Sequence, residues 1–228
     1  MDKLYEKLKD YTIDDAIKFE QKDRQFIALK NLYENKKFQD ELYLILIIIN
    51  ALISFQLSWK GEDYWEEFSV KLGKNNKIED IYNFFEDLLK NGKNNRRFVD
   101  MKLKRVEKFL DWFSVEKLED LEKFYKNMDK LAEKLSKIMN QKIDAKTIVF
   151  AVKMFSYWAR NVFWYLQNFP ENLMIPIDSR LENLYKRYNW EASKKEIKNY
   201  YRGLSKKLNI PLLHLDAILW INYEELVK

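Results

Sequence analysis

The spacing of the apolar residues is the feature that most limits which fold this chain can adopt. They recur at intervals of three and four residues along most of the chain, which is the period of an amphipathic helix. Only four glycines and three prolines interrupt 228 residues, so few tight turns are available. We therefore expect an all-α fold with short loops and no strand.

The same pattern predicts where the helices begin and end. Breaks are expected at Gly61, after Gly73, at 91–95, at 141–145 and in the 170–176 connection, where the second proline forces its predecessor out of helical geometry. The expected helices cover 13–35, 39–58, 62–72, 78–91, 96–112, 115–139, 146–168, 179–188, 193–208 and 211–226.

The composition excludes several kinds of enzyme chemistry. The chain has no cysteine and one histidine, which rules out disulfides, iron–sulfur clusters and a thiol nucleophile and leaves too few ligands for a multi-histidine metal site. We expect no metal and no cofactor. An enzyme with this sequence must use lysines and carboxylates.

The amino terminus and the longest uncharged segment bear on localisation. The first residues alternate charged and apolar side chains, unlike a signal peptide. The segment 42–59 carries no charge, but Asn50, Ser54 and Gln56 interrupt it, which favours a buried core helix over a membrane span. We expect a cytoplasmic protein without membrane association, and a monomer because nothing in the sequence indicates an oligomer.

Positive charge is concentrated in two segments. Residues 93–108 hold seven basic residues against two acidic ones, and 194–207 hold six against one. Each segment therefore carries as much positive charge as the whole chain, whose net charge is +5. Such patches are typical of surfaces that follow phosphates, and the alternative is a pair of solvated helix faces.

Two lysines stand out beside the apolar segment 147–162. Lys146 precedes it and Lys153 lies within it, seven residues later, so both share one helical stripe with Phe150. A desolvated lysine has a lowered pKa and a nucleophilic free amine. The alternative for Lys153 is an edge position with its stem packed and its head in water.

A single carboxylate stands in the apolar segment 211–223. Asp216 and Trp220 are four residues apart and so lie on one helix face. A carboxylate among apolar side chains needs a partner, so we expect Asp216 to face a polar cavity or Lys153, the alternative being a wet helix edge. His214 has no metal-binding companions in the sequence, and we expect it to be structural or on the surface.

A third segment, 174–181, ends an apolar connector at Asp178. This residue is well placed to cap the helix that begins with Ser179. A capping carboxylate is held rigidly, and its free oxygen can stabilise positive charge in a neighbouring cleft. Capping and a catalytic role are compatible at this position.

Taken together, these segments resemble the archaeal 8-oxoguanine DNA glycosylases, the archaeal GO glycosylase branch of the helix–hairpin–helix superfamily. The matching stretches span most of the chain and are INALISFQLSWKGEDYWEEF (49–68), KTIVFAVKMFSYW (146–158), IPIDSRL (175–181) and NIPLLHLDAILW (209–220), with a shorter match at KDRQF (22–26).

The resemblance implies a fold and an activity. The implied fold is one domain over 1–228 with two helical subdomains flanking a DNA-binding cleft, and a hairpin element near 128–160. The implied enzyme is a bifunctional glycosylase and AP lyase that excises 8-oxoguanine from double-stranded DNA, with single-stranded DNA as a second candidate substrate. One departure is that residues 141–144 contain no glycine, whereas the wider superfamily has a glycine-rich hairpin turn.

The resemblance also implies residue roles. It makes Lys146 the nucleophile and Asp178 the counterpart of the superfamily's catalytic aspartate. The side chains that it places around the damaged base are Gln25, Trp65, Phe150, Lys153, Asp216 and Trp220.

These residue types suit the implied chemistry. A base inside a duplex must be extruded before it can be reached, and aromatic faces then stack on it. A carboxylate accepts from the guanine N–H groups, and an amine that attacks C1′ forms a Schiff base that permits β-elimination. The alternatives are a non-catalytic helical nucleic-acid-binding protein, a glycosylase of the same fold for another damaged base, and a helical protein whose aromatic residues bind a protein partner.

Overall fold

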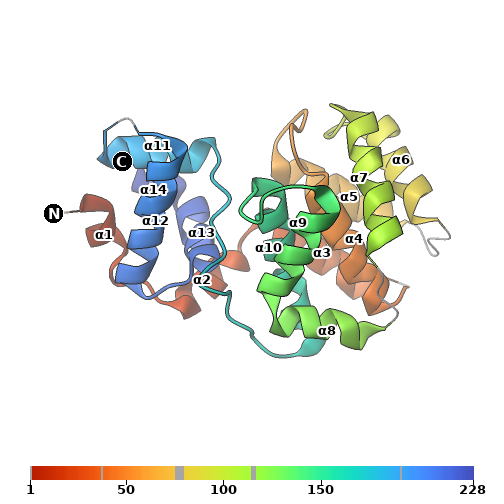
Figure 1. Cartoon of the computed structure of the whole chain (residues 1–228), viewed down its shortest axis with the longest axis horizontal. Helices are drawn as coiled ribbons and strands as arrows, with labels where there is room; N and C mark the ends of the chain where they lie inside the picture. Colours follow the sequence, from red (N-terminus) through yellow and green to blue (C-terminus); the bar gives the residue numbers. More distant parts are fainter. Residues whose placement is uncertain (1, 37, 75–79, 114–116, 191) are drawn as a thin grey trace. The chain divides into compact units, whose positions relative to one another are not determined.

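The computed structural model describes residues 2–36, 38–74, 80–113, 117–190 and 192–228, and these residues form α-helices without any strand. The all-α prediction is therefore confirmed for the described part of the chain. The helices divide into two compact units, and each is described below by itself (Figure 1). One unit is Arg24–Gln167, and the other combines the residues up to Asp23 with Asn168–Lys228.

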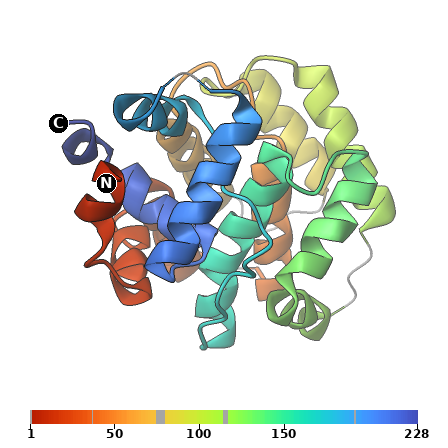
Figure 2. The same ribbon diagram turned by 60° about the vertical axis from the view of Figure 1, so that its left-hand side comes forward.

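The unit Arg24–Gln167 is built around its last helix. This helix, α10, packs chiefly against α4 and also contacts α8 and α9, while α3 packs along α5 (Figures 1 and 2). The helices of this unit are α3 (Arg24–Asn35), α4 (Asp40–Leu52), α5 (Gly61–Gly73), α6 (Ile81–Asn91), α7 (Val99–Trp112), α8 (Leu118–Lys126), α9 (Met128–Met139) and α10 (Lys146–Phe163).

The core of this unit explains the uncharged segment 42–59. Its first part, up to Leu52, lies in α4, where the residues from Tyr43 to Leu52 are buried except for the half-buried Ile45. The polar Asn50 is tolerated because its side-chain oxygen accepts a hydrogen bond of 2.6 Å from the buried Tyr64 hydroxyl. The expected core helix is confirmed. Within the described residues, none of the helices combines the length and hydropathy that a membrane crossing requires.

The second unit is built around α13 (Leu212–Ile221), which packs chiefly against α2 (Ile13–Glu20). Buried His214 on α13 pairs through Nδ1 with Glu20 Oε1 of α2 at 3.0 Å, and its ring contacts Phe169. His214 is thus structural, as expected. The other helices of this unit are α1 (Lys3–Leu8), α11 (Ser179–Tyr188), α12 (Lys194–Leu208) and α14 (Tyr223–Leu226).

Three of the expected helices are each two helices in the structure. The helix expected over 13–35 is interrupted between Glu20 and Arg24. The one expected over 115–139 is interrupted at Asn127, and the one over 211–226 at Asn222. Asn127 takes non-helical backbone angles and its side-chain amide donates to Lys123 O at 3.1 Å. Asparagine favours such breaks because its side chain competes for backbone hydrogen bonds.

Other expected boundaries also differ. The helices predicted to reach 58 and 168 end at Leu52 and Phe163, and α1 was not predicted. Ser54 donates to Asn50 O at 2.6 Å, and Trp164 adopts a left-handed conformation that terminates α10. The expected starts at 78 and 115, and part of the break after Gly73, lie outside the described residues.

Candidate functional site

A tight turn joins α9 to α10 and sets the position of Lys146. Asn140 adopts the left-handed conformation, φ 48° and ψ 52°, which glycine commonly supplies at the end of a helix. Its backbone N–H donates to Lys137 O, and the Gln141 N–H donates to Ser136 O at 3.0 Å. Asn140, one position before the expected turn, therefore takes the left-handed conformation in a connection that contains no glycine.

Hydrogen bonds of Thr147 tie the first turn of α10 to the preceding turn and to α7. The Thr147 hydroxyl donates to Gln141 Oε1 at 2.9 Å, which joins the helix to the turn before it. Arg105 of α7 donates to Thr147 Oγ1 at 3.3 Å and to Leu52 O at 2.8 Å. Its guanidinium also lies 4.2 Å from the centroid of the Phe55 ring. Arg105 thus braces the backbone that carries Lys146, and sequence reasoning saw it only as one member of a basic segment.

The predicted stripe on α10 exists, and its burial increases along the helix. Lys146 is exposed at the first helical position, Phe150 is half-buried one turn later, and Lys153 is only 4% exposed. The Lys153 ammonium lies 5.3 Å from the centroid of the Tyr157 ring. The alternative of a wet edge position for Lys153 is therefore wrong, and the desolvated lysine of the stripe is Lys153 rather than Lys146.

Helix α5 holds one further predicted residue and contacts another, which lies on α3. Trp65 is fully buried and its indole meets the Phe150 ring edge-on, with 6.0 Å between the centroids. Gln25 of α3 is buried, and its amide nitrogen would lie 3.3 Å from a Cβ at Gly61, the first residue of α5. Glycine at this position therefore leaves the room that the Gln25 amide occupies.

Asp178 caps α11, as predicted. Its Oδ1 accepts from the Leu181 N–H at 3.0 Å, and α11 begins at Ser179. Buried Tyr201 of α12 donates to the carbonyl of Leu181 at 2.8 Å. Burial raises the pKa of the Tyr201 hydroxyl, and the nearby Tyr200 and the carboxylates of Asp178 and Asp216 raise it further. Tyr201 is a neighbour of both carboxylates that sequence reasoning missed.

The face of α13 that carries Asp216 also carries Trp220. Asp216 is 4% exposed, so the alternative of a wet helix edge is wrong. Trp220 is half-buried, and the Arg180 guanidinium of α11 lies over its ring, 3.8 Å from the centroid. Stacking of this kind holds an indole ring in a fixed plane.

The predicted residues therefore fall into two groups. The unit Arg24–Gln167 holds Gln25, Trp65, Phe150, Lys153 and Lys146, which offer an accessible amine beside buried polar and aromatic side chains. The other unit holds Asp178 and Asp216, two carboxylates close to the Tyr201 hydroxyl, and Trp220 on the same helix face as Asp216. Among the described residues, no group of three or more histidine or carboxylate side chains is placed to hold a metal ion.

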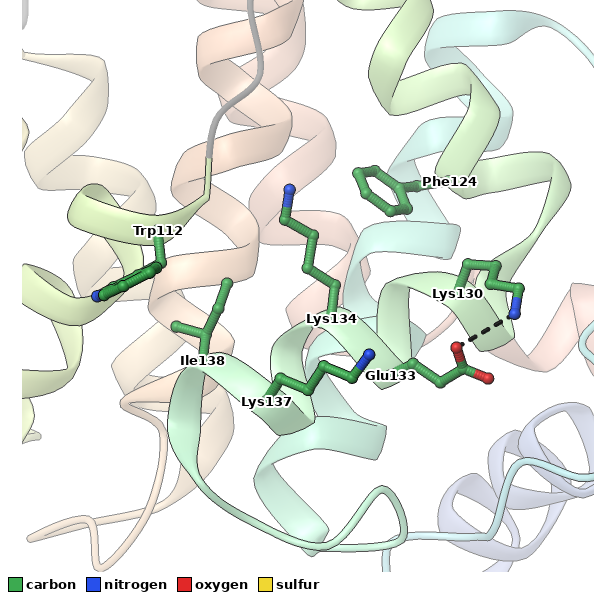
Figure 3. A pocket seen from close by; sticks show the side chains of 7 residues that line it. All are labelled: Trp112, Phe124, Lys130, Glu133, Lys134, Lys137 and Ile138. Carbon is green, nitrogen blue, oxygen red and sulfur yellow. Dashed lines mark hydrogen bonds and ion pairs between the residues drawn. The ribbon is translucent and has the colours of Figure 1, made fainter.

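A separate hollow lies against the outer face of α9, and none of the predicted site residues lines it. Figure 3 shows Lys134 extending from α9 between Trp112 and Phe124, with Lys130 paired to Glu133 at 3.2 Å beside it. The Lys134 ammonium lies 5.5 Å from the centroid of the Phe124 ring. Lys137 and Ile138 complete the lining.

Comparisons with known proteins agree on one family. Residues 5–226 match the AGOG family, described as N-glycosylase/DNA lyase. Two relatives with that name are 41% identical over 220 residues in Nanoarchaeum equitans and 38% identical over 199 residues in Methanococcus maripaludis. The first match covers 96% of this chain and 89% of the relative, and the second covers 87% and 77%.

A solved structure agrees as well. It is that of the 8-oxoguanine DNA glycosylase from Pyrobaculum aerophilum in complex with 8-oxoguanosine, and it superposes with a TM-score of 0.82 at 26% identity. The superposition covers 95% of this chain and 84% of the other.

Proposed function

Because the chain belongs to the AGOG family of N-glycosylases/DNA lyases, we propose that it excises 8-oxoguanine from DNA with Lys146 as the nucleophile and then nicks the strand. The observation that carries the proposal is the position of Lys146. Its amine is exposed at the first residue of α10, directly after a braced turn, so a bulky substrate such as a DNA backbone can approach it.

In the proposed reaction, the neutral amine of Lys146 attacks the sugar C1′. The bond from C1′ to the base breaks, and the base leaves with the bonding electrons and takes up a proton. Loss of a proton from the new ammonium and opening of the sugar ring give a Schiff base. Removal of a C2′ proton then breaks the C3′–O bond, and the 3′ phosphate leaves.

The Asp178 carboxylate would stabilise the positive charge that these reaction steps create. Positive charge develops at C1′ as the base departs, and a fixed carboxylate stabilises it without needing to reorganise. The cap on Leu181 supplies that fixed position, since one carboxylate oxygen is engaged at 3.0 Å while the other can accept elsewhere. Proton transfers to and from the lysine would use the same carboxylate.

The remaining predicted residues would bind the extruded base. Phe150 and Trp220 offer faces for stacking, and the plane of Trp220 is fixed by Arg180. Asp216 would accept from the N–H groups of the Watson–Crick edge. Gln25 and Trp65 can distinguish the oxidised base, since oxidation adds O8 and turns N7 from an acceptor into a donor.

We also propose that the enzyme acts as a monomer on double-stranded DNA. The substrate is tested by base release from duplexes that carry 8-oxoguanine, uracil or an alkylated purine. Release from the 8-oxoguanine duplex alone is expected. Faster release from another duplex would assign the fold to a different lesion, and binding without any release would indicate a non-catalytic DNA-binding protein.

A further inference from the structure

The hollow on the outer face of α9 is a feature that the proposed chemistry leaves unused. Trp112, at the end of α7, and Phe124 of α8 stand at its edges (Figure 3). Its volume of about 630 Å³ lies in the range of ligand pockets, about 300 to 1,000 Å³. The side chains that α9 contributes share one helical stripe, and they are Lys130, Glu133, Lys134, Lys137 and Ile138.

The aromatic side chains at the edges of the hollow are open to a ligand. Trp112 is 70% exposed, and within the described part of the chain no ring contacts its indole. Phe124 is half-buried and stacks on Phe113, with 5.7 Å between the ring centroids. Neighbouring apolar side chains that remain exposed are typical of binding surfaces.

The hollow also carries positive charge that nothing in its lining neutralises. Lys130 and Glu133 pair with each other at 3.2 Å, so their charges cancel. The other two lysines, Lys134 and Lys137, form no ion pair with any carboxylate of the described residues. Unneutralised cations beside apolar side chains attract a partner that is both acidic and apolar.

Aromatic contacts hold the Lys134 ammonium in place. The side chain is half-buried, and its Nζ lies 4.9 Å from the centroid of the Phe113 ring and 5.5 Å from that of the Phe124 ring. Cations over aromatic faces are attracted to them, which restricts this side chain before anything binds. A side chain that is already restricted loses less conformational entropy on binding. Lys134 is therefore preorganised to pair with a carboxylate.

The combination of these groups favours a protein segment over a nucleic acid. A DNA strand carries a phosphate at every nucleotide and is bound by a series of cations. The hollow offers only two unpaired lysines, one helical turn apart, and the Glu133 carboxylate belongs to its lining. A concave apolar surface with few charges suits one large side chain that projects from a peptide.

We propose that the hollow binds a short segment of a protein partner in which a large apolar side chain is flanked by acidic residues. The apolar side chain lies against Trp112 and Phe124, and the acidic neighbours pair with Lys134 and Lys137. The inference is independent of the proposed function, since none of the residues assigned to base excision lines the hollow.

Binding of synthetic acidic peptides to the full chain tests the inference. The peptides carry one central leucine, phenylalanine or tryptophan between aspartates, and fluorescence anisotropy of an attached dye reports binding. We expect binding that weakens as salt is added, because the charges lie near the surface. Peptides with a central serine, or with lysines in place of the aspartates, should not bind.

Matched variants assign the binding to the hollow. Lys134→Gln and Trp112→Ala should each weaken peptide binding about tenfold or more, since one removes a charged partner and the other an aromatic contact. Both should release 8-oxoguanine at the wild-type rate, which also shows that they fold. The controls are Lys60→Gln and Trp59→Ala, which change an exposed lysine and an indole of the same 70% exposure outside the hollow. Both controls should bind the peptide as the wild type does.

The contrary results are equally distinct. Failure of every acidic peptide to bind the wild type, or equal binding by the wild type and Trp112→Ala, would overturn the inference. Displacement of the peptide by a short single-stranded oligonucleotide, with slower release of 8-oxoguanine by Trp112→Ala, would assign the hollow to DNA and overturn it as well. A wild type that binds the peptide but releases no 8-oxoguanine would support the inference and overturn the proposed function.

Discussion

Asp178→Asn separates the two roles assigned to Asp178, because it removes the charge and keeps the cap. The side-chain oxygen of asparagine can accept the same hydrogen bond from the Leu181 N–H that Asp178 accepts at 3.0 Å. Asparagine and aspartate are equally good at the N-cap position. A purely structural residue should therefore tolerate the change.

The magnitudes of the two effects differ enough to be distinguished. Loss of a negative charge beside a helix N-terminus lowers the free energy of unfolding by about 0.3 to 1 kcal/mol. Asp178→Ala also removes the cap, which lowers it by about 1 kcal/mol more. Loss of a preorganised group that stabilises transition-state charge slows the chemical step by about 10²-fold or more. Asp178→Asn should then be nearly as stable as the wild type and strongly impaired.

Urea unfolding and single-turnover release of 8-oxoguanine, measured on the same preparations, provide the comparison. We expect Asp178→Asn and Asp178→Ala to share the catalytic defect while only the alanine variant shows the full loss of stability. If Asp178→Asn releases the base at the wild-type rate, Asp178 is a helix cap and nothing more.

Two further predictions concern the basic segment. Arg105→Met removes the donor to both Leu52 O and Thr147 Oγ1, so the single-turnover rate should fall about tenfold at unchanged KM; equal rates in Arg105→Met and the exposed control Lys104→Gln, which loses the same charge, would contradict this. Burial, then the charges of Arg105 and Arg97, lowers the pKa of Lys102 from 10.5 to about 8. The unfolded chain thus binds more protons between these pH values, and stability rises with pH there by about 3 kcal/mol at most. Lys102→Met should abolish this rise in urea unfolding between pH 7 and 10, and a persisting rise would assign it to another group.

Periodicity predicted most of the fold because apolar spacing is a local property of the sequence. It located the buried α4, the start of α10 and the whole of α11. It joined α8 to α9 across Asn127, because a single asparagine between two amphipathic segments leaves the apolar spacing almost unchanged. At the break the Asn127 side chain donates to a backbone carbonyl, and apolar spacing does not report such a bond.

The candidate site was predictable where it depended on spacing within one helix. The stripe of Lys146, Phe150 and Lys153 and the cap at Asp178 are of this kind. The burial of Lys153 was not predictable, because it depends on what packs against α10. The contact of Arg105 with Thr147 joins residues 42 positions apart, and no pattern within either segment indicates it.

The exposed ring of Phe98 is a further case that the sequence alone does not reveal. An aromatic residue after two arginines is equally compatible with a buried anchor. Only the left-handed backbone and the side-chain exposure of 54% distinguish the two. Two residues just before it, Asn95 and Arg96, form hydrogen bonds with a loop about forty residues earlier in the chain.

Covalent trapping tests the assignment of Lys146 most directly. Borohydride reduces the Schiff base between enzyme and DNA to a stable adduct, which is seen as a slower band on a denaturing gel. With an 8-oxoguanine duplex, the wild type and the control Lys142→Gln, whose exposed lysine lies in the adjacent turn, should both form the adduct. Lys146→Gln should form none. An adduct of wild-type yield from Lys146→Gln would show that another amine is the nucleophile.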